Sequence, residues 1–234
     1  FPMVILSLWE TSQEKSNQFL ALFLVLESGI LGTLVAFDLV LFYTFLELML
    51  IPMYLIIGQY GNKNKIYATT TFAMYTVFSS FILLLAAIGL YQYHQQQFGF
   101  FSTSLLDLYK LSNIPVSLQV WLCSGFLLAF AIKVPLWPFH TWLPHAHTEA
   151  PTAGSVIITG IMIKIGIYGF LRIAIPLFPQ AIEIIAPLVS SIAAFSILYG
   201  AMIAWKQENS KKIVAFLSLS QMGYIFIGCI MVTG

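Results

Sequence analysis

Long apolar runs separated by short polar segments dominate the sequence. Seven runs are long enough for a helix that crosses a bilayer, which requires roughly 20 residues. They cover residues 19–37, 39–58, 67–91, 116–139, 153–175, 184–205 and 213–232. The runs lack the strict alternation of apolar and polar positions that indicates a half-buried strand. The pattern therefore predicts an all-helical, polytopic transmembrane bundle that forms one membrane domain over residues 1–234.

The basic residues near the ends of the apolar runs divide unequally between the two ends of these predicted helices. If consecutive helices alternate in direction, Lys110 and Arg172 lie at one end, and the other end holds Lys15, Lys63, Lys65, Lys206, Lys211 and Lys212. Cytoplasmic and matrix loops have an excess of Lys and Arg, so we expect the lysine-rich end on that side. Tyrosines and tryptophans fall at the predicted helix ends, as an interfacial aromatic belt requires.

The fourth apolar run contains a predicted break. Lys133 ends its apolar part and is followed by Pro135 and Pro138. Proline has no N–H, so the carbonyls of Ala131 and Val134 are expected to lack their helical donors. Such a break is tolerated at membrane depth where protein or water satisfies the freed groups, and discontinuous helices often mark ion paths. The sequence thus predicts one proline-broken helix with Lys133 beside an interior polar cavity.

Composition supports a membrane protein and argues against several other classes. Apolar residues make up 59% of the chain and charged residues 8%, whereas soluble domains have roughly 25% charged residues. The net charge of +1 offers no basic surface for nucleic acid. Cys123 and Cys229 lie inside apolar runs without metal or redox spacing, so we expect them to have a packing role. The sequence also lacks GxGxxG, P-loop, HExxH and nucleophile-elbow motifs, which predicts that this chain binds no cofactor.

Two glutamates lie inside the first two predicted helices. Glu27 and Glu47 are each roughly 12 Å from the start of their helix. A carboxylate at that depth is costly unless it is paired, hydrated or protonated, so a functional role is the first hypothesis. The alternative is a protonated Glu that hydrogen-bonds a neighbouring helix, and this alternative has more weight for Glu27 than for Glu47. Asp38, at the junction of the two helices, is expected to cap the second one.

Two lysines are embedded in apolar sequence on either side of the predicted break. Lys164 is roughly 16 Å along its helix, near the middle of the bilayer, and Lys133 ends the preceding run. Burial lowers the pKa of a lysine and a nearby carboxylate raises it again. We therefore predict that Glu47 loads and releases a proton on Lys133 as the two groups approach and separate, and that Lys164 is a second proton carrier. A fixed buried ion pair is the alternative role.

Three histidines are close together in the connection after the break. His140, His145 and His147, with Glu149, resemble a ligand set by composition. We expect them in an irregular, proline-broken segment and not on one helical face, which argues against a metal or haem site. A proton relay through His140 and His147, or hydrogen bonding to the freed backbone, is the preferred interpretation.

Three segments carry a resemblance to a known family. They are KVPLWPFHTWLPHAHTEAPTAGSVIITGIMIKIGIYGFLR (133–172), DLVLFYTFLELMLIPMYLIIG (38–58) and, more loosely, SKKIVAFLSLSQMGYIFIG (210–228). Together they resemble the antiporter-like membrane subunits of respiratory complex I, most closely the chain 4 type. That family is in turn similar to membrane subunits of multi-subunit cation/proton antiporters. His145 and Gln221 depart from residues that are common in the family.

The resemblance has consequences for fold, site and partners. It implies two five-helix repeats of opposite topology, the first at residues 19–175 and the start of the second at 184–234. It implies that Glu47, Lys133 and Lys164 line a proton path at mid-membrane, with His140 and His147 at matching positions. NADH, FMN, iron–sulfur clusters and ubiquinone would be bound by partner subunits. The expected partners are neighbouring antiporter-like subunits, lipid and possibly a separate chain that supplies the missing helices.

The predicted function is proton translocation by a non-redox subunit of an NADH:ubiquinone oxidoreductase. The alternatives are a subunit of a cation/proton antiporter, a plastid-type relative that works with ferredoxin, and a truncated structural subunit of the membrane arm. The expected location is the mitochondrial inner membrane, with a bacterial plasma membrane or a thylakoid membrane as alternatives. Residues 1–8 are too short for a transmembrane helix or a signal peptide, and we expect them to be the end of a longer segment.

Overall fold

A computed structural model describes residues 16–111 and 114–231. Seven segments in these residues are long and apolar enough to cross a membrane, which agrees with the predicted all-helical transmembrane bundle. Residues 1–8, Lys15 and Val232 lie outside the described part of the chain.

The first three segments contain four helices. They are α2 (Ser16–Val35), α3 (Leu39–Leu48), α4 (Leu50–Tyr60) and α5 (Lys65–Phe98). The second segment is interrupted at Met49 because Pro52 has no N–H to donate to the carbonyl of Leu48. The third is longer than predicted because it continues through residues 92–98, which are mostly polar, and it ends at Gly99 with a φ of 75°.

The remaining segments include the broken helix. After the single turn α6 (Leu105–Leu108), α7 (Val116–Lys133) ends before Pro135 and the chain resumes as α8 (Trp142–Glu149). The fifth segment comprises α9 (Thr152–Ile157), the π-helical η2 (Ile158–Met162), α10 (Ile163–Gly169), the π-helical η3 (Phe170–Ala174) and α11 (Ile175–Leu177). The last two are α12 (Pro179–Trp205) and α13 (Ser210–Met231).

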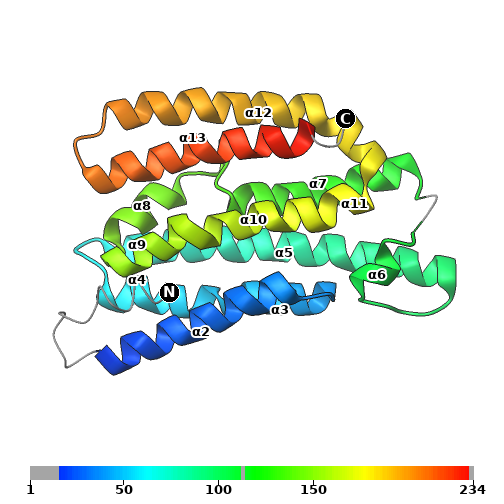
Figure 1. The fold of residues 1–234 in the computed structure, drawn as a ribbon, viewed down its shortest axis with the longest axis horizontal. Helices are drawn as coiled ribbons and strands as arrows, with labels where there is room; N and C mark the ends of the chain where they lie inside the picture. The colour runs from blue at the N-terminus through cyan, green and yellow to red at the C-terminus, as the bar shows by residue number, and fades with distance from the viewer. Residues whose placement is uncertain (1–15, 112–113, 232–234) are drawn as a thin grey trace.

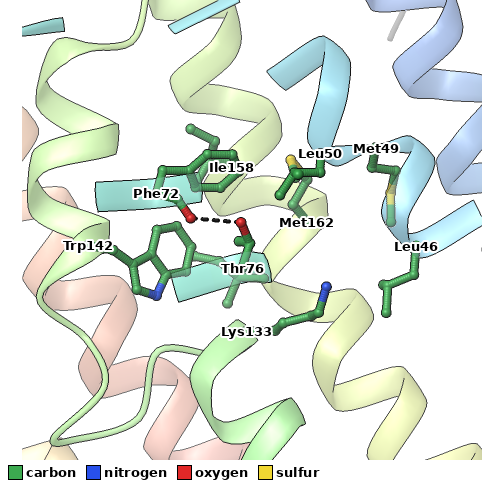
Figure 2. Close-up of a pocket in the computed structure, with 10 residues that line it drawn as sticks. Leu46, Met49, Leu50, Phe72, Thr76, Lys133, Trp142, Ile158 and Met162 are labelled. Atoms are coloured by element: carbon green, nitrogen blue, oxygen red, sulfur yellow. Dashed lines mark hydrogen bonds between the residues drawn. The ribbon is translucent and has the colours of Figure 1, made fainter. Parts of the chain in front are cut away.

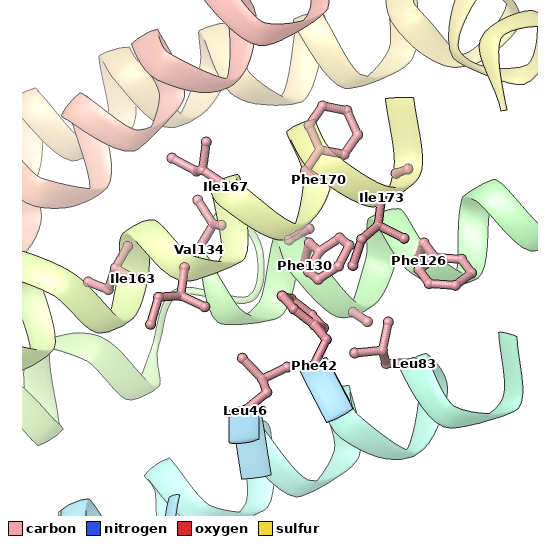
Figure 3. Close-up of a cluster of buried hydrophobic side chains, with 14 of the residues drawn as sticks. Phe42, Leu46, Leu83, Phe126, Phe130, Val134, Ile163, Ile167, Phe170 and Ile173 are labelled. Carbon is pink, nitrogen blue, oxygen red and sulfur yellow. The ribbon is translucent and has the colours of Figure 1, made fainter. Parts of the chain in front are cut away.

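The long helices lie roughly parallel in a layered bundle (Figure 1). Helices α12 and α13 form a hairpin along one side, and α2, α3 and α4 lie along the other, with α5, α7 and α10 between them. Aromatic and aliphatic side chains fill the space where α3, α5, α7 and α10 meet (Figure 3). There the rings of Phe42 and Phe130 pack edge to face with centroids 6.5 Å apart. This core places α3, α5 and the end of α7 against one another at mid-bundle.

The two ends of the bundle differ in charge as the sequence predicts. The α4–α5 and α12–α13 turns lie at the same end (Figure 1), and the Nζ of Lys211 donates to the carbonyl of Ala150 at 2.7 Å. At the opposite end, the hydroxyl of Tyr109 donates to the carbonyl of Arg172 at 2.5 Å. The lysines in the described residues therefore separate into a lysine-rich and a lysine-poor end.

Asp38 ties the start of α3 to the loop between α5 and α6. Its Oδ1 accepts hydrogen bonds from the amides of Val40 at 2.8 Å and Leu41 at 3.1 Å, which confirms the predicted cap. Its Oδ2 accepts from the hydroxyl of Thr103, and the amide of Leu39 donates to the Thr103 carbonyl at 2.9 Å. The first turn of α3 is thus held from two sides.

Candidate functional site

The broken helix satisfies part of its own backbone at the break. The carbonyl of Ala131 lacks the helical donor that Pro135 cannot supply, as predicted, and accepts instead from the amide of Leu136 at 2.9 Å. The chain turns after Val134, and the first available amide beyond Pro135 reaches back to it. The carbonyl of Ile132 accepts from the indole Nε1 of Trp142 at 3.0 Å. A side chain of α8 therefore supplies a donor to the last turn of α7, next to Lys133.

Lys133, Glu47 and Ser80 meet at this point. The Nζ of Lys133 lies 3.5 Å from Oε1 of Glu47 and 3.2 Å from Oγ of Ser80. The hydroxyl of Ser80 donates to Oε1 of Glu47 and to the carbonyl of Thr76. The Lys133 side chain is 11% exposed and that of Glu47 is 26% exposed. Three different segments thus contribute one polar side chain each to a single group inside the bundle.

This geometry keeps opposite charges together in an apolar environment. Removing a charge from water costs several kcal/mol, and a close partner with further hydrogen bonds repays much of that cost. Separating Glu47 from Lys133 leaves a buried ammonium without its counter-ion, which favours release of the proton. Ser80 was missed in the sequence analysis. A partial signal for it was present, because Thr76 and Ser80 lie four residues apart on one face of α5.

A cavity of about 30 Å³ adjoins Lys133 (Figure 2). That volume has room for a water molecule. Its lining combines the Lys133 ammonium and the Thr76 hydroxyl with apolar side chains of four segments, namely Leu46, Met49, Leu50, Phe72, Trp142, Ile158, Met162 and Ile163. The predicted cavity beside Lys133 is present, although it is mostly apolar.

Lys164 does not join the Glu47–Lys133 pair. Its neighbour Ile163 lines the cavity, but the Lys164 side chain is exposed on the described part of the bundle. Its Nζ donates to the carbonyl of Thr159 at 2.5 Å. Lys164 lies on α10, between the two π-helical segments. Such π-helical turns occur often at functional sites. Lys164 is exposed, whereas the side chain of Lys133 is only 11% exposed.

Glu27 also lies apart from the pair. It is half-buried on α2, and no hydrogen bond or ion pair of its carboxylate is found within residues 16–111 and 114–231.

His140 and His147 are buried at 5% and 4% exposure. Their Nδ1 atoms have no hydrogen-bond partner among the described residues. Burial lowers the pKa of both imidazoles, and the charge of Lys211 lowers that of His147 further. These shifts favour the neutral imidazole, which can both donate and accept a proton.

The connection between the break and α9 is more regular than predicted. His145 and His147 belong to α8, so the expectation of an irregular segment was wrong for residues 142–149. The side chains of Trp142 and Leu143, in the first turn of α8, are buried, and their burial stabilises the helix. His145 is exposed and packs edge-on against Tyr67, with ring centroids 5.0 Å apart. Within the described residues, His, Cys, Asp and Glu side chains form no group of three that would hold a metal ion.

Comparison with known proteins identifies the family of this chain. Residues 36–234 match the family described as NADH:quinone oxidoreductase/Mrp antiporter, TM. The chain belongs to this family. Subunit M of the NADH-quinone oxidoreductase of Rickettsia prowazekii is 43% identical over 218 residues, which are 93% of this chain and 43% of that protein. Chain 4 of the NADH-ubiquinone oxidoreductase of Chondrus crispus is 40% identical over 227 residues, 96% of this chain and 44% of the relative.

A solved structure shows the same fold. In respiratory complex I from Thermus thermophilus with bound NADH, one chain superposes with a TM-score of 0.86 at 33% sequence identity. The match covers 97% of this chain and 46% of that chain. The chain therefore spans less than half the length of these relatives. Together with the two curated relatives, this match confirms the resemblance to antiporter-like complex I membrane subunits of the M or chain 4 type.

Proposed function

We propose that this chain is a proton-translocating membrane-arm subunit of an NADH:quinone oxidoreductase. The observation that supports the proposal most strongly is the buried Glu47–Ser80–Lys133 group at the end of a broken helix. An ionisable pair inside a transmembrane bundle is costly to maintain and typical of a proton path. The family and the subunit M and chain 4 relatives support the same function.

The proposed step is a change of distance between two charges. When Glu47 is within reach, the Lys133 ammonium keeps its proton because the carboxylate stabilises the positive charge. When Glu47 moves away, Lys133 passes one proton to a water molecule or to the next carrier and becomes a neutral amine. Return of Glu47 then favours uptake of a new proton. Each cycle transfers one proton and leaves both side chains as they began.

Lys164 is the proposed second carrier. Its exposed side chain bonds to the Thr159 carbonyl and not to the Lys133 group, so a proton that leaves the first lysine requires an intermediate path. The neutral imidazoles of His140 and His147 are proposed as relay groups near the break. Glu27 is proposed to act as a lesser contributor, because it is half-buried within α2.

The surroundings of the chain follow from the same proposal. Partner subunits bind NADH, FMN, iron–sulfur clusters and quinone, and neighbouring antiporter-like subunits contact this chain in the membrane. Residues 19–175 form a first repeat and 184–234 the start of an inverted second repeat. The proposed location of the chain is the mitochondrial inner membrane or a bacterial plasma membrane, since both a bacterial subunit M and a chain 4 protein have similar sequences.

Replacement of Glu47 by Gln tests the proposal. The amide keeps the size and hydrogen bonds of the side chain but cannot balance the charge of Lys133. We expect quinone-dependent proton pumping in native membranes to fall by about tenfold or more while the complex still assembles. Glu183→Gln is the matched control, because Glu183 is exposed on α12. Pumping at the original level in an assembled Glu47→Gln complex would contradict the proposal.

One measurement separates this function from cation/proton exchange without a redox partner. A subunit of the oxidoreductase co-purifies with iron–sulfur subunits from native membranes. A chain that purifies without them and exchanges Na⁺ for protons would support the antiporter, which the family description also includes.

A further inference from the structure

A second, larger pocket opens at the lysine-rich end of the bundle. Its volume is about 280 Å³, and it lies between the start of α5, helix α8 and the start of α13. Polar side chains dominate its lining, which comprises Asn64, Tyr67, Ala68, Pro144, His145, Thr148, Glu149 and Lys212. The carboxylate of Glu149 accepts from the amide of Asn64 at 3.0 Å and holds the rim together. This outer pocket is wide and polar enough for water.

The outer pocket and the Lys133 cavity follow the same two helices. On α5, Ala68 lines the outer pocket and Thr76 lines the inner cavity, about 12 Å further along the helix. Ala68, Phe72, Thr76 and Ser80 are spaced by four residues and therefore share one face, and all four are buried. This face leads from the lysine-rich end directly to the Glu47–Ser80–Lys133 group.

Helix α8, like α5, lines both the outer pocket and the inner cavity. Thr148 and His145 line the outer pocket, and Trp142, about one turn before His145, lines the inner cavity. The outer pocket and the inner cavity thus follow one another along α5 and α8.

An aromatic pair from α5 and α8 lines the inner cavity, and Phe72 lies one turn beyond Ala68 of the outer pocket. The rings of Phe72 and Trp142 lie with centroids 5.5 Å apart, and the side chains are 1% and 3% exposed. Trp142 is held by its hydrogen bond to the Ile132 carbonyl. Phe72 has no polar side-chain atom, so a change of its rotamer breaks no hydrogen bond. Trp142 is therefore the fixed member of the pair and Phe72 the movable one.

We propose that Phe72 and Trp142 form a gate that controls access of water, and with it protons, from the lysine-rich end to Lys133. The inference rests on the proposed function, because it assigns an access path to the same lysine. In the arrangement described here the gate is closed, since both rings are buried and in contact with each other, and both line the inner cavity (Figure 2). A closed gate separates the Lys133 cavity from the water of the outer pocket. Rotation of Phe72 joins the outer pocket to the inner cavity.

Cysteine labelling in the assembled complex tests the gate. A single cysteine replaces Thr148 at the outer pocket or Thr76 at the inner cavity, with Cys123→Ala and Cys229→Ala in both. A small, charged, membrane-impermeant thiol reagent is added at the lysine-rich end, and labelling of this chain is followed by mass spectrometry. We expect the cysteine at 148 to react readily and the cysteine at 76 to react slowly.

Phe72→Ala provides the decisive comparison. It should speed labelling at position 76 by about tenfold or more and leave labelling at position 148 unchanged. Phe78→Ala is the matched control, because Phe78 is on the same helix but 58% exposed, and it should change neither rate. Phe72→Leu is a smaller change of volume and replaces the alanine variant if that variant does not assemble. It should speed labelling at position 76, but by less than the tenfold expected for alanine.

Two results would overturn the gate. One is fast labelling at position 76 with Phe72 intact, and the other is a rate that neither Phe72 variant changes in an assembled complex. Labelling does not depend on pumping. If the Glu47→Gln complex still pumps but Phe72 controls labelling, the gate stands and the proposed relay fails.

Discussion

At the scale of single residues, the position of the Lys133 ammonium depends on two oxygens. Glu47 supplies the opposite charge, whereas Ser80 contacts both charged groups and holds them at a defined distance. Hydrogen bonds to charged groups contribute about 1.5–3 kcal/mol each. Ser80 therefore positions the pair, and its removal changes the Glu47–Lys133 distance without removing a charge.

Ser80→Ala isolates that positioning role. We expect the assembled complex to pump about three- to tenfold more slowly, and the pH at which pumping is half-maximal to shift, because the Lys133–Glu47 distance is no longer fixed. Ser191→Ala is the control, since the Ser191 hydroxyl donates only to the carbonyl of Pro187 in its own helix. A rate and pH profile identical to those of the unmodified complex would show that Ser80 is dispensable.

Lys164→Arg tests whether the second lysine exchanges protons. Arginine keeps the positive charge but stays protonated at all relevant pH. We expect quinone-dependent pumping to collapse, by about tenfold or more, in a complex that assembles normally. Lys206→Arg, an exposed lysine at the lysine-rich end, serves as the control. If Lys164→Arg pumps at the original level, Lys164 is a structural cation.

At the scale of elements, close contact between helices fixes where the lysines lie. A Cβ added at Gly166 of α10 would lie 2.6 Å from Cγ2 of Val134 and 3.4 Å from Cβ of Lys133. The absence of a side chain at Gly166 thus lets α10 approach the end of α7. Any shift of α10 there moves Lys164 relative to Lys133 at the end of α7.

Gly166→Ala should disturb this contact. The added methyl group overlaps Val134, and overpacking of this kind typically costs about 1–3 kcal/mol. We expect lower thermal stability of the complex and reduced pumping. Gly160→Ala, on the same membrane segment but with nothing within 4 Å of the added Cβ, should leave both unchanged. Equal behaviour of the two variants would contradict the packing argument.

Local sequence patterns predicted some of these elements better than others. The seven spans, the break near Pro135 and the Asp38 cap follow from local composition, and the structure contains all three. The replacement donor of the Ala131 carbonyl was not predicted, because it depends on the path of the chain beyond the proline. Ser80 was not predicted, because its partners are 33 and 53 residues away in sequence and only packing brings them together.

At the scale of the whole molecule, the two ends of the bundle have different chemical character. The described lysines of the α4–α5 and α12–α13 turns share one end with the outer pocket. Lys110 lies at the other end, where it pairs with Asp107 at 2.8 Å. This asymmetry gives the proposed proton path a defined entrance.

Labelling of intact membrane vesicles checks this sidedness. Single cysteines at Lys63 and Lys206 should react with an impermeant reagent added on one side, and a cysteine at Lys110 should react only from the other. The expectation follows from the positions of the turns on opposite ends of helices that cross the membrane. Reaction of all three cysteines from the same side would contradict the topology.

The hydrogen bonds at Asp38 hold the start of helix α3 in place, so a movement of α3 would be a tilt about that end. Its first turn is fixed to Thr103, and its other end meets the interruption at Met49. Glu47 therefore lies about 13 Å from Asp38, close to the end of α3 that meets Met49. A tilt of about 10° about Asp38 would displace the Glu47 carboxylate by about 2 Å over this length. Since Glu47 and Lys133 are 3.5 Å apart, a small angular movement of one short helix is sufficient to open the ion pair.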